Sequence, residues 1–213
     1  AHITVMNNYL HTTLFEIAGS LTNYGTIKYT SDTINGLNDI TFFNISGSGG
    51  KLFNALSGEI KIPNISGSPK SINIFNAPNG ATFINAGKIG VGNITTSSSL
   101  PIRIFNAENG ATFVNDYYGQ IEVGNITPSS SQSIRIFNIL SESTLTNGGN
   151  ININNINTGS YGFFVVDSSF TNTSDISLGE IQDSWGFHFE KSFFKHTSGE
   201  IVINKITNKS VGI

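Results

Sequence analysis

A repeat of about thirty residues runs through this chain of 213 residues and restricts the folds that it can adopt. The two clearest copies, 73–85 and 103–115, read NIFNAPNGATFIN and RIFNAENGATFVN. Each copy is followed by a Gly-x-Ile-x-Val-Gly-Asn-Ile motif, at 87–94 and 119–126, and then by a Ser-rich stretch. Repetition with a period of about 20–50 residues indicates structural units that stack on one another.

Aligning the rest of the chain on this template gives three columns of apolar residues. The first column comprises Phe15, Phe43, Phe75, Phe105, Phe137, Val165 and Phe189. The second comprises Ile3, Ile27, Ile60, Ile89, Ile121, Ile151, Ile176 and Ile201. The third comprises Leu21, Phe53, Phe83, Phe113, Leu145, Phe170 and Phe194. Three apolar columns per repeat predict three short strands per repeat.

The residue types of the repeat favour β-structure. The chain contains 27 Asn and 23 Gly, which are poor helix formers, whereas the Ile, Val and Phe of the columns favour strands. Apolar residues alternate in the second column, as in Ile89/Val91 and Ile121/Val123, which places one face of the strand inside. Asparagine then marks a bend, because the Ile that follows would otherwise point outward. These bend positions are Asn64, Asn93, Asn125 and Asn155.

The repeats vary in length from 24 to 33 residues, which favours a parallel β-helix over helical arrays or propeller blades. Loops of a coil can lengthen at little cost while its strands stay in register. We therefore predict an all-β fold, a right-handed parallel β-helix of about seven coils with three short strands and 24–33 residues per coil. Residues 1–213 are expected to form a single β-solenoid domain. Because neither end carries a recognisable cap, we expect a segment of a longer repeat rod with uncapped ends.

Two sets of residues are the candidate structural sites. The core columns are represented by Phe43, Phe75, Phe105, Phe137, Ile60, Ile89, Ile121 and Ile151. Asparagine recurs in register at Asn44, Asn76, Asn106 and Asn138, and again at Asn23, Asn85, Asn115, Asn147 and Asn172. Stacked Asn side chains bond their equivalents along the axis of cross-β structures, so these positions and the bend positions predict Asn ladders. A polar ligand-binding face is the alternative interpretation.

Asn-Gly pairs between the columns are candidates for tight turns with positive φ. The pairs Asn79-Gly80 and Asn109-Gly110 occupy equivalent positions in the two clearest repeats. Asn35-Gly36 and Asn147-Gly148 are further candidates for the same turn.

This style of repeat resembles the right-handed parallel β-helix proteins. The Asn, Ser, Thr and Gly content looks like that of repeat regions in large bacterial surface proteins, adhesins and appendage fibres. The resemblance covers nearly the whole chain and rests on the style of the repeat, without a signature motif. It implies an extracellular or cell-surface location. The partners it implies are other copies of the chain, or adjoining solenoid segments, stacked end to end.

Residues that could perform chemistry concentrate in the last two repeats. They are Asp167, Asp175, Asp183, Trp185, His188, Glu190, Lys191, His196 and Glu200. Polysaccharide-degrading β-helix enzymes need two carboxylates across a cleft, or a carboxylate with Lys or Arg, plus aromatic platforms. Solvated charge on shorter coils is the alternative, and we predict no catalytic residue because most coils offer only Ser, Thr, Asn and Gly. His188, Glu190 and His196 match no known ligand spacing, so neither a metal nor a cofactor is expected.

Charge and composition restrict the remaining classes of function. A net charge of −3 with 11 Lys and Arg argues against a nucleic-acid partner, and the absence of Cys excludes disulfides and thiol chemistry. No apolar run approaches the roughly 18 residues of a membrane span, so membrane insertion is not expected. The sequence predicts a structural, non-enzymatic extracellular β-solenoid, a rigid spacer or fibre segment of a bacterial surface appendage or adhesin. A module that binds carbohydrate, such as cell-surface glycan, or another cell surface is the alternative, and a fragment of a polysaccharide-degrading β-helix enzyme is the third interpretation.

Overall fold

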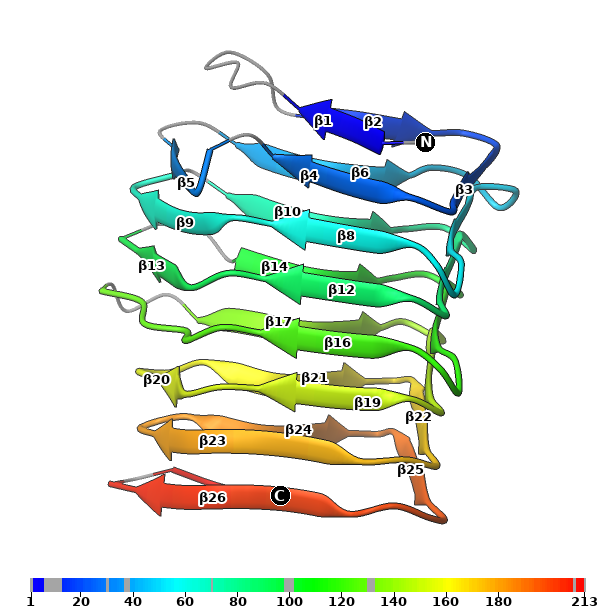
Figure 1. Ribbon diagram of the computed structural model, residues 1–213. Coiled ribbons are helices and arrows are strands. Elements are labelled where there is room, and N and C mark those ends of the chain that lie inside the picture. The colour runs from blue at the N-terminus through cyan, green and yellow to red at the C-terminus, as the bar shows by residue number, and fades with distance from the viewer. Residues whose placement is uncertain are drawn as a thin grey trace.

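The computed structural model describes residues 2–5, 13–29, 31–36, 39–69, 71–97, 102–129, 133–208 and 210–212. These residues form parallel strands joined by turns, without a helix, and they wind into a β-solenoid (Figure 1). In Figure 1 the chain runs leftward along the front strands, passes round the left-hand end and returns along the rear strands as it descends, which is a right-handed winding. The expected all-β parallel solenoid is confirmed.

Each coil contributes one strand to each of three sheets. The first sheet has the order β1 (His2–Val5), β4 (Thr26–Tyr29), β8 (Glu59–Ile62), β12 (Lys88–Val91), β16 (Gln120–Val123), β19 (Asn150–Ile153), β23 (Ile176–Gln182) and β20 (Ile156–Asn157), with β26 (Ile201–Thr207) also pairing β23. The second sheet has the order β2 (Thr13–Ile17), β6 (Ile40–Ile45), β10 (Ile72–Ala77), β14 (Ile102–Ala107), β17 (Ile134–Leu140), β21 (Tyr161–Val166) and β24 (Trp185–Glu190).

The third sheet and a short fourth sheet complete the coils. The third sheet has the order β25 (Phe193–His196), β22 (Ser169–Asn172), β18 (Thr144–Asn147), β15 (Thr112–Asn115), β11 (Thr82–Asn85), β7 (Lys51–Asn54) and β3 (Ser20–Asn23). The fourth sheet follows the bend after the first sheet and has the order β13 (Ile94–Thr96), β9 (Asn64–Gly67) and β5 (Thr33–Gly36). Because all pairs are parallel, equivalent residues of successive coils lie one strand spacing apart, about 4.8 Å.

The solenoid makes about five turns, somewhat fewer than the seven coils expected. Among the described residues the second and third sheets have seven strands each, and the first and last of these are edges. Five strands of each of these two sheets therefore pair with a strand on both sides.

Apolar columns fill the interior. In the second sheet Phe43, Phe75, Phe105 and Phe137 lie in direct register, at most 1% exposed, with rings stacked at centroid distances of 4.7–5.1 Å. The second column lies in register in the first sheet along its whole expected length. Its members Ile60, Ile89, Ile121 and Ile151 are at most 1% exposed. Burial of such side chains contributes about 1.5–3 kcal/mol each against the entropy of ordering the chain.

The structure corrects two of the expected columns. The Phe column continues through Phe163 and Phe187, and not through Val165 and Phe189. Phe163 pairs with Phe137, and Phe187 pairs with Phe163. A shift of two residues along a strand keeps the same face, so apolar alternation alone does not distinguish these residues. In the third column Leu52, and not Phe53, pairs with Phe83. Leu52 is 0% exposed, and the shift of one residue turns Phe53 to the opposite face.

Two of the expected turns are present. Asn79 and Gly80 have φ of 55° and 75°, and Asn109 and Gly110 have φ of 56° and 77°. The other two Asn-Gly pairs do not form such turns, because Asn35-Gly36 lies within β5, and Asn147 ends β18 with no positive φ at Gly148.

Candidate functional site

The candidate sites of this solenoid are columns of polar side chains that connect successive coils. The first column is buried and stands at the last residue of each third-sheet strand, β3, β7, β11, β15, β18 and β22. In each contact an Asn Nδ2 donates to the Asn Oδ1 of the next coil at 2.7–2.8 Å. This buried ladder comprises Asn23, Asn54, Asn85, Asn115, Asn147 and Asn172.

Asn54 is a member of the buried ladder that the sequence analysis missed. The error follows from the third column, where Phe53 was aligned in place of Leu52, so that the Asn two residues after Leu52 fell out of register. At the other end Asn172 Nδ2 lies 3.0 Å from Nδ1 of His196. Because an amide N–H is a donor only, Nδ1 of His196 is the acceptor in this contact.

A glycine packs against the buried ladder in successive coils. A Cβ added to Gly119 would lie 2.2 Å from Oδ1 of Asn115 and 2.5 Å from the carbonyl oxygen of Asn85. A Cβ on Gly87 would lie 2.2 Å from the carbonyl oxygen of Gly58. The Asn and the Gly that follows it are therefore one unit, because the close approach of the coils at this corner leaves no room for a side chain.

A second column lies on the outer face of the second sheet. Nδ2 of Asn76, Asn106 and Asn138 donates to Oδ1 of the preceding coil at 2.7, 2.8 and 2.5 Å. Asn44 in turn donates to both carboxylate oxygens of Glu16, at 2.8 and 3.1 Å. Hydrogen bonds from the side chains of Ser46 and Asn44 hold the pKa of Glu16 below its ordinary value of 4.5.

The opposite end of this outer ladder meets a cation. Nη1 of Arg135 donates to Oδ1 of Asn138 at 3.0 Å. The amides therefore point one way, from a guanidinium donor to a carboxylate acceptor, and the aligned bonds polarise one another favourably. In the buried ladder the amides donate in the opposite sense, toward the C-terminal coils.

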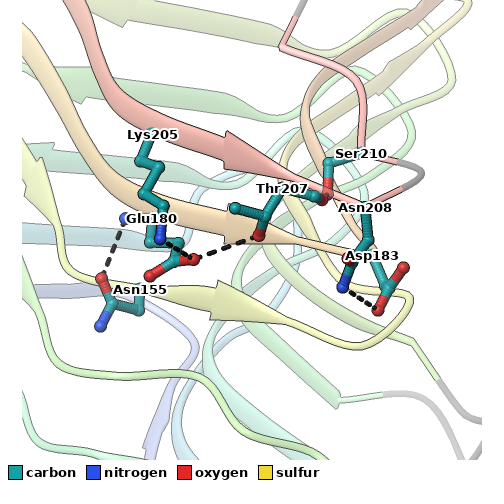
Figure 2. Close-up of polar contacts among 7 residues, drawn as sticks. All are labelled: Asn155, Glu180, Asp183, Lys205, Thr207, Asn208 and Ser210. Carbon is teal, nitrogen blue, oxygen red and sulfur yellow. Dashed lines mark hydrogen bonds and ion pairs between the residues drawn. The ribbon is translucent and has the colours of Figure 1, made fainter.

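A third column stands at the bends after the first sheet. Oδ1 of Asn64, Asn93 and Asn125 accepts from the backbone N–H of the equivalent Asn in the next coil, at 2.8, 2.8 and 3.3 Å. Asn155 continues this bend ladder by accepting from the backbone N–H of Glu180 at 2.9 Å (Figure 2). Each bend is thereby tied to the bend of the next coil.

Charged side chains replace amides in the last coils. Figure 2 shows Glu180 of β23 accepting from Lys205 Nζ at 3.0 Å and from Thr207 Oγ1 at 3.1 Å, both on β26. The hydrogen bond from Lys205, and to a smaller extent the one from Thr207, lower the pKa of Glu180. Asp183 accepts from Asn208 Nδ2 at 3.1 Å in the same view. These contacts join successive coils, as the Asn ladders do.

The carboxylates singled out in the sequence lie in the last coils, at different turns and strand ends. Asp175 Oδ1 accepts from the backbone N–H of Glu200 at 2.9 Å, and the two residues lie in one column. Asp167, Asp183 and Lys191 occupy turns with φ of 48°, 50° and 48°.

His188 and His196 lie on different sheets. His196 ends the buried ladder on β25, whereas His188 lies on β24 with its ring stacked on Phe164 at 4.8 Å. The described part of the chain holds no group of three or more His, Cys, Asp or Glu side chains arranged to bind a metal ion. Nor do the described residues include a helix long and apolar enough to cross a membrane.

A shallow groove of about 700 Å³ follows the outside of the bend. Its lining includes Lys28, Asp32, Lys61 and Asn64. A second hollow of about 380 Å³ shares Lys61 with it and extends over the next coils. The sequence analysis gave no signal for this groove, because the concave surface arises where the fourth sheet turns away from the first.

The sheets, the stacked core and the repeated polar columns define the chain as a parallel β-solenoid. Comparison of the chain with models of protein families, with curated proteins and with solved structures found no match.

Proposed function

We propose that this β-solenoid is a rigid, non-enzymatic spacer or fibre segment of a bacterial surface appendage or adhesin, located outside the cell or on its surface. The observation that carries the proposal is the ladder contact between neighbouring coils, where Asn85, Asn115 and Asn147 link three coils at 2.8 Å inside the core. A rod that has to keep its shape under load benefits from bonds that run along its axis at every step.

Force along the rod axis is shared by three kinds of contact between coils. Parallel pairing in the three main sheets places the backbone hydrogen bonds between coils along the rod axis. The ladders add side-chain bonds in the same direction, and the stacked Phe and Ile columns resist sideways displacement. Load on one coil is therefore distributed over backbone, amide and core contacts together.

The partner in this proposal is a further parallel coil, from a second copy or an adjoining segment, on β26. Ile206 pairs with Ile181 in register, yet Ile206 is 48% exposed and Ile181 is 0% exposed. The column to which they belong is buried at Ile65, Ile94, Ile126 and Ile156, and it is partly buried at Ile34 in the first strand of the fourth sheet. A coil stacked on β26 would bury Ile206 in the same way and would pair the edge of the strand.

Electron microscopy at increasing protein concentration tests this stacking. We expect rods that lengthen with concentration, and we expect Ile206→Lys to prevent the lengthening because it places a charge in the buried column. Leu56→Lys is the control, since Leu56 is 64% exposed in a side turn away from the edge. Single short particles at all concentrations, or the same loss in both variants, would contradict end-to-end stacking.

The non-enzymatic part of the proposal has its own test. The chain is incubated with a panel of neutral and acidic polysaccharides, and new reducing ends or unsaturated sugars are measured. We expect none above background. Turnover that disappears in Asp183→Asn, Glu190→Gln or His188→Ala would instead identify the chain as a polysaccharide-degrading enzyme.

A further inference from the structure

Four outward side chains form a continuous column on the second sheet beside the outer ladder. Arg103 pairs in register with Arg135, Arg135 with Tyr161, and Tyr161 with Trp185. Three strand spacings of about 4.8 Å separate the first from the last, so the column extends over about 14 Å. It changes along its length from two cations to two aromatic rings.

The two arginines are held together without an acidic partner. In the described part of the chain the ion pairs are Lys61–Glu59 and Lys205–Glu180, and neither involves an arginine. Nε of Arg103 and Nε of Arg135 are both enclosed and have no hydrogen-bond partner. Like charges directly opposite on adjacent strands destabilise a sheet, and an enclosed guanidinium donor without an acceptor adds a desolvation cost.

The electrostatics of Arg135 agree with this geometry. Burial is the main cause that lowers the pKa of Arg135, and the charge of Arg103 lowers it further. The charges of Tyr161 and Glu108 raise this pKa by less. A structural role accounts for part of Arg135, which donates to Asn138 and lies with Cζ 3.8 Å from the centre of the Phe164 ring. Among the described residues, Arg103 makes no such contact.

The aromatic half of the column is part of a cluster of four rings. Tyr161 and Trp185 stack with centroids 6.2 Å apart and planes 14° apart. Phe164 and His188 stack beside them at 4.8 Å and 6°. Trp185 is 37% exposed, whereas Phe75, Phe105 and Phe137 on the inner face of the same sheet are at most 1% exposed. Tyr161 is half-buried, and Trp, Tyr and Arg are the residue types enriched among the residues that dominate the binding energy of interfaces.

We propose that this column binds a carboxylated polysaccharide, a polymer of hexuronate sugars, along the solenoid axis. The sugar carboxylates pair with the guanidinium groups of Arg103 and Arg135, whose fork of N–H donors matches a carboxylate, and they relieve the repulsion between the two cations. The apolar faces of the following sugar rings pack on Tyr161 and Trp185. The site is independent of the spacer role, because a rod can carry it or lack it.

Fluorescence titration of the whole chain tests the site, since Trp185 is the single tryptophan of the protein and reports directly from it. The probes are oligomers of galacturonate, of mannuronate and of hyaluronan, and the fully methyl-esterified galacturonate oligomer is the uncharged control. We expect at least one acidic oligomer to change the emission saturably, and the ester of galacturonate not to. Binding should weaken steeply with added salt, because the attraction between the charges is screened.

Two substitutions separate the site from general charge effects. Arg103→Gln is expected to weaken binding about tenfold or more, since a hydrogen bond to a charged group is lost. Lys88→Gln removes one positive charge from β12 on another sheet and should leave the affinity unchanged. Circular dichroism melts of both variants check that the fold is intact.

The proposal is overturned by any of three results. These are no response to all three acidic oligomers, equal binding of the methyl ester, and equal affinity of Arg103→Gln and the unaltered chain. A heparin oligomer that binds more tightly than every uronate oligomer would also overturn it, by assigning the column to sulfate.

Discussion

At the residue scale, Asn115 shows how a polar side chain becomes part of the core. It is 0% exposed, accepts from Asn85 and donates to Asn147, and its Nδ2 also lies 3.3 Å from the carbonyl oxygen of Asn150. A buried amide is tolerated when its groups are paired, and here the repeat supplies the partners automatically. Replacing one Asn of the ladder therefore removes a hydrogen bond from each of its two neighbours.

We predict that Asn115→Ala lowers the free energy of unfolding by about 2–5 kcal/mol. The substitution leaves the buried Nδ2 of Asn85 without its acceptor and the buried Oδ1 of Asn147 without its donor. Urea denaturation followed by circular dichroism measures the change. Asn152→Ala is the control, since Asn152 is an exposed residue of β19. A loss for Asn115→Ala no larger than that of the control would show that the ladder does not stabilise the fold.

The carboxylate at the end of the outer ladder predicts a pH effect. The pKa of Glu16 is lowered in the folded chain by hydrogen bonds from Ser46 and Asn44. A lowered folded pKa means that the stabilisation is complete above the ordinary value of 4.5 and is lost as pH falls through the lower folded value. Because Glu16 is exposed, the effect is small.

Glu16→Gln should therefore make melting temperature less dependent on pH below the ordinary pKa of a glutamate. Melts recorded from about pH 6 to about pH 3 measure this slope. Glu142→Gln, at an exposed turn residue, is the matched control. Identical acid slopes in the unaltered chain and in Glu16→Gln would refute the role of this carboxylate.

At the scale of the element, the corner between the third and first sheets depends on close packing of strand ends. The Asn that ends β15 and the Gly before β16 approach the coil above so closely that a methyl group would overlap backbone atoms. Strands of the first sheet also contain a glycine with open surroundings, Gly90, where an added Cβ meets nothing within 4 Å. Close packing therefore requires glycine at Gly119, whereas the space around Gly90 would accept a side chain.

We predict that Gly119→Ala destabilises the fold by about 1–3 kcal/mol through overpacking, whereas Gly90→Ala is neutral or slightly stabilising because it reduces the entropy of the unfolded chain. Thermal and urea unfolding of both variants give the comparison. The corner is not a packing constraint if the two variants have the same stability.

At the scale of the whole molecule, each coil contacts chiefly the coils next to it. Ile102 is the register partner of Ile134, so residues 102–133 correspond to one complete coil. Removing them would bring Phe75 beside Phe137 and Asn85 beside Asn147, which are equivalent positions in the register. Stability in stacked repeats is approximately a sum of coil terms and neighbour terms.

Deletion of residues 102–133 should therefore give a shorter chain that still folds, with a lower free energy of unfolding and a smaller urea m value. Deletion of residues 102–117, half of that coil, is the control and should abolish folding because it breaks the register of every sheet. Circular dichroism and urea titration distinguish the two. A full-coil deletion that is unfolded would contradict the additive description.

The sequence by itself determined the architecture, because near-identical repeats such as 73–85 and 103–115 oblige equivalent residues to occupy equivalent places. In these repeats the Phe and Ile columns follow from period-two alternation, which needs no tertiary information. The pattern was insufficient where the repeats diverge, at Leu52 and after Phe137, because neighbouring apolar residues offered more than one alignment.

Only the tertiary structure decided which outward residues meet. Arg103 and Arg135 stand at equivalent positions of two similar repeats, but Tyr161 and Trp185 belong to repeats that have diverged at this position, so no periodicity in the sequence relates the aromatic pair to the arginines. The direction of the amide ladders, and their ends at Glu16, Arg135 and His196, likewise depend on which atoms face each other across coils. Core positions repeat because burial selects the same residue type in every coil, whereas surface positions are free to differ and acquire meaning only through their neighbours.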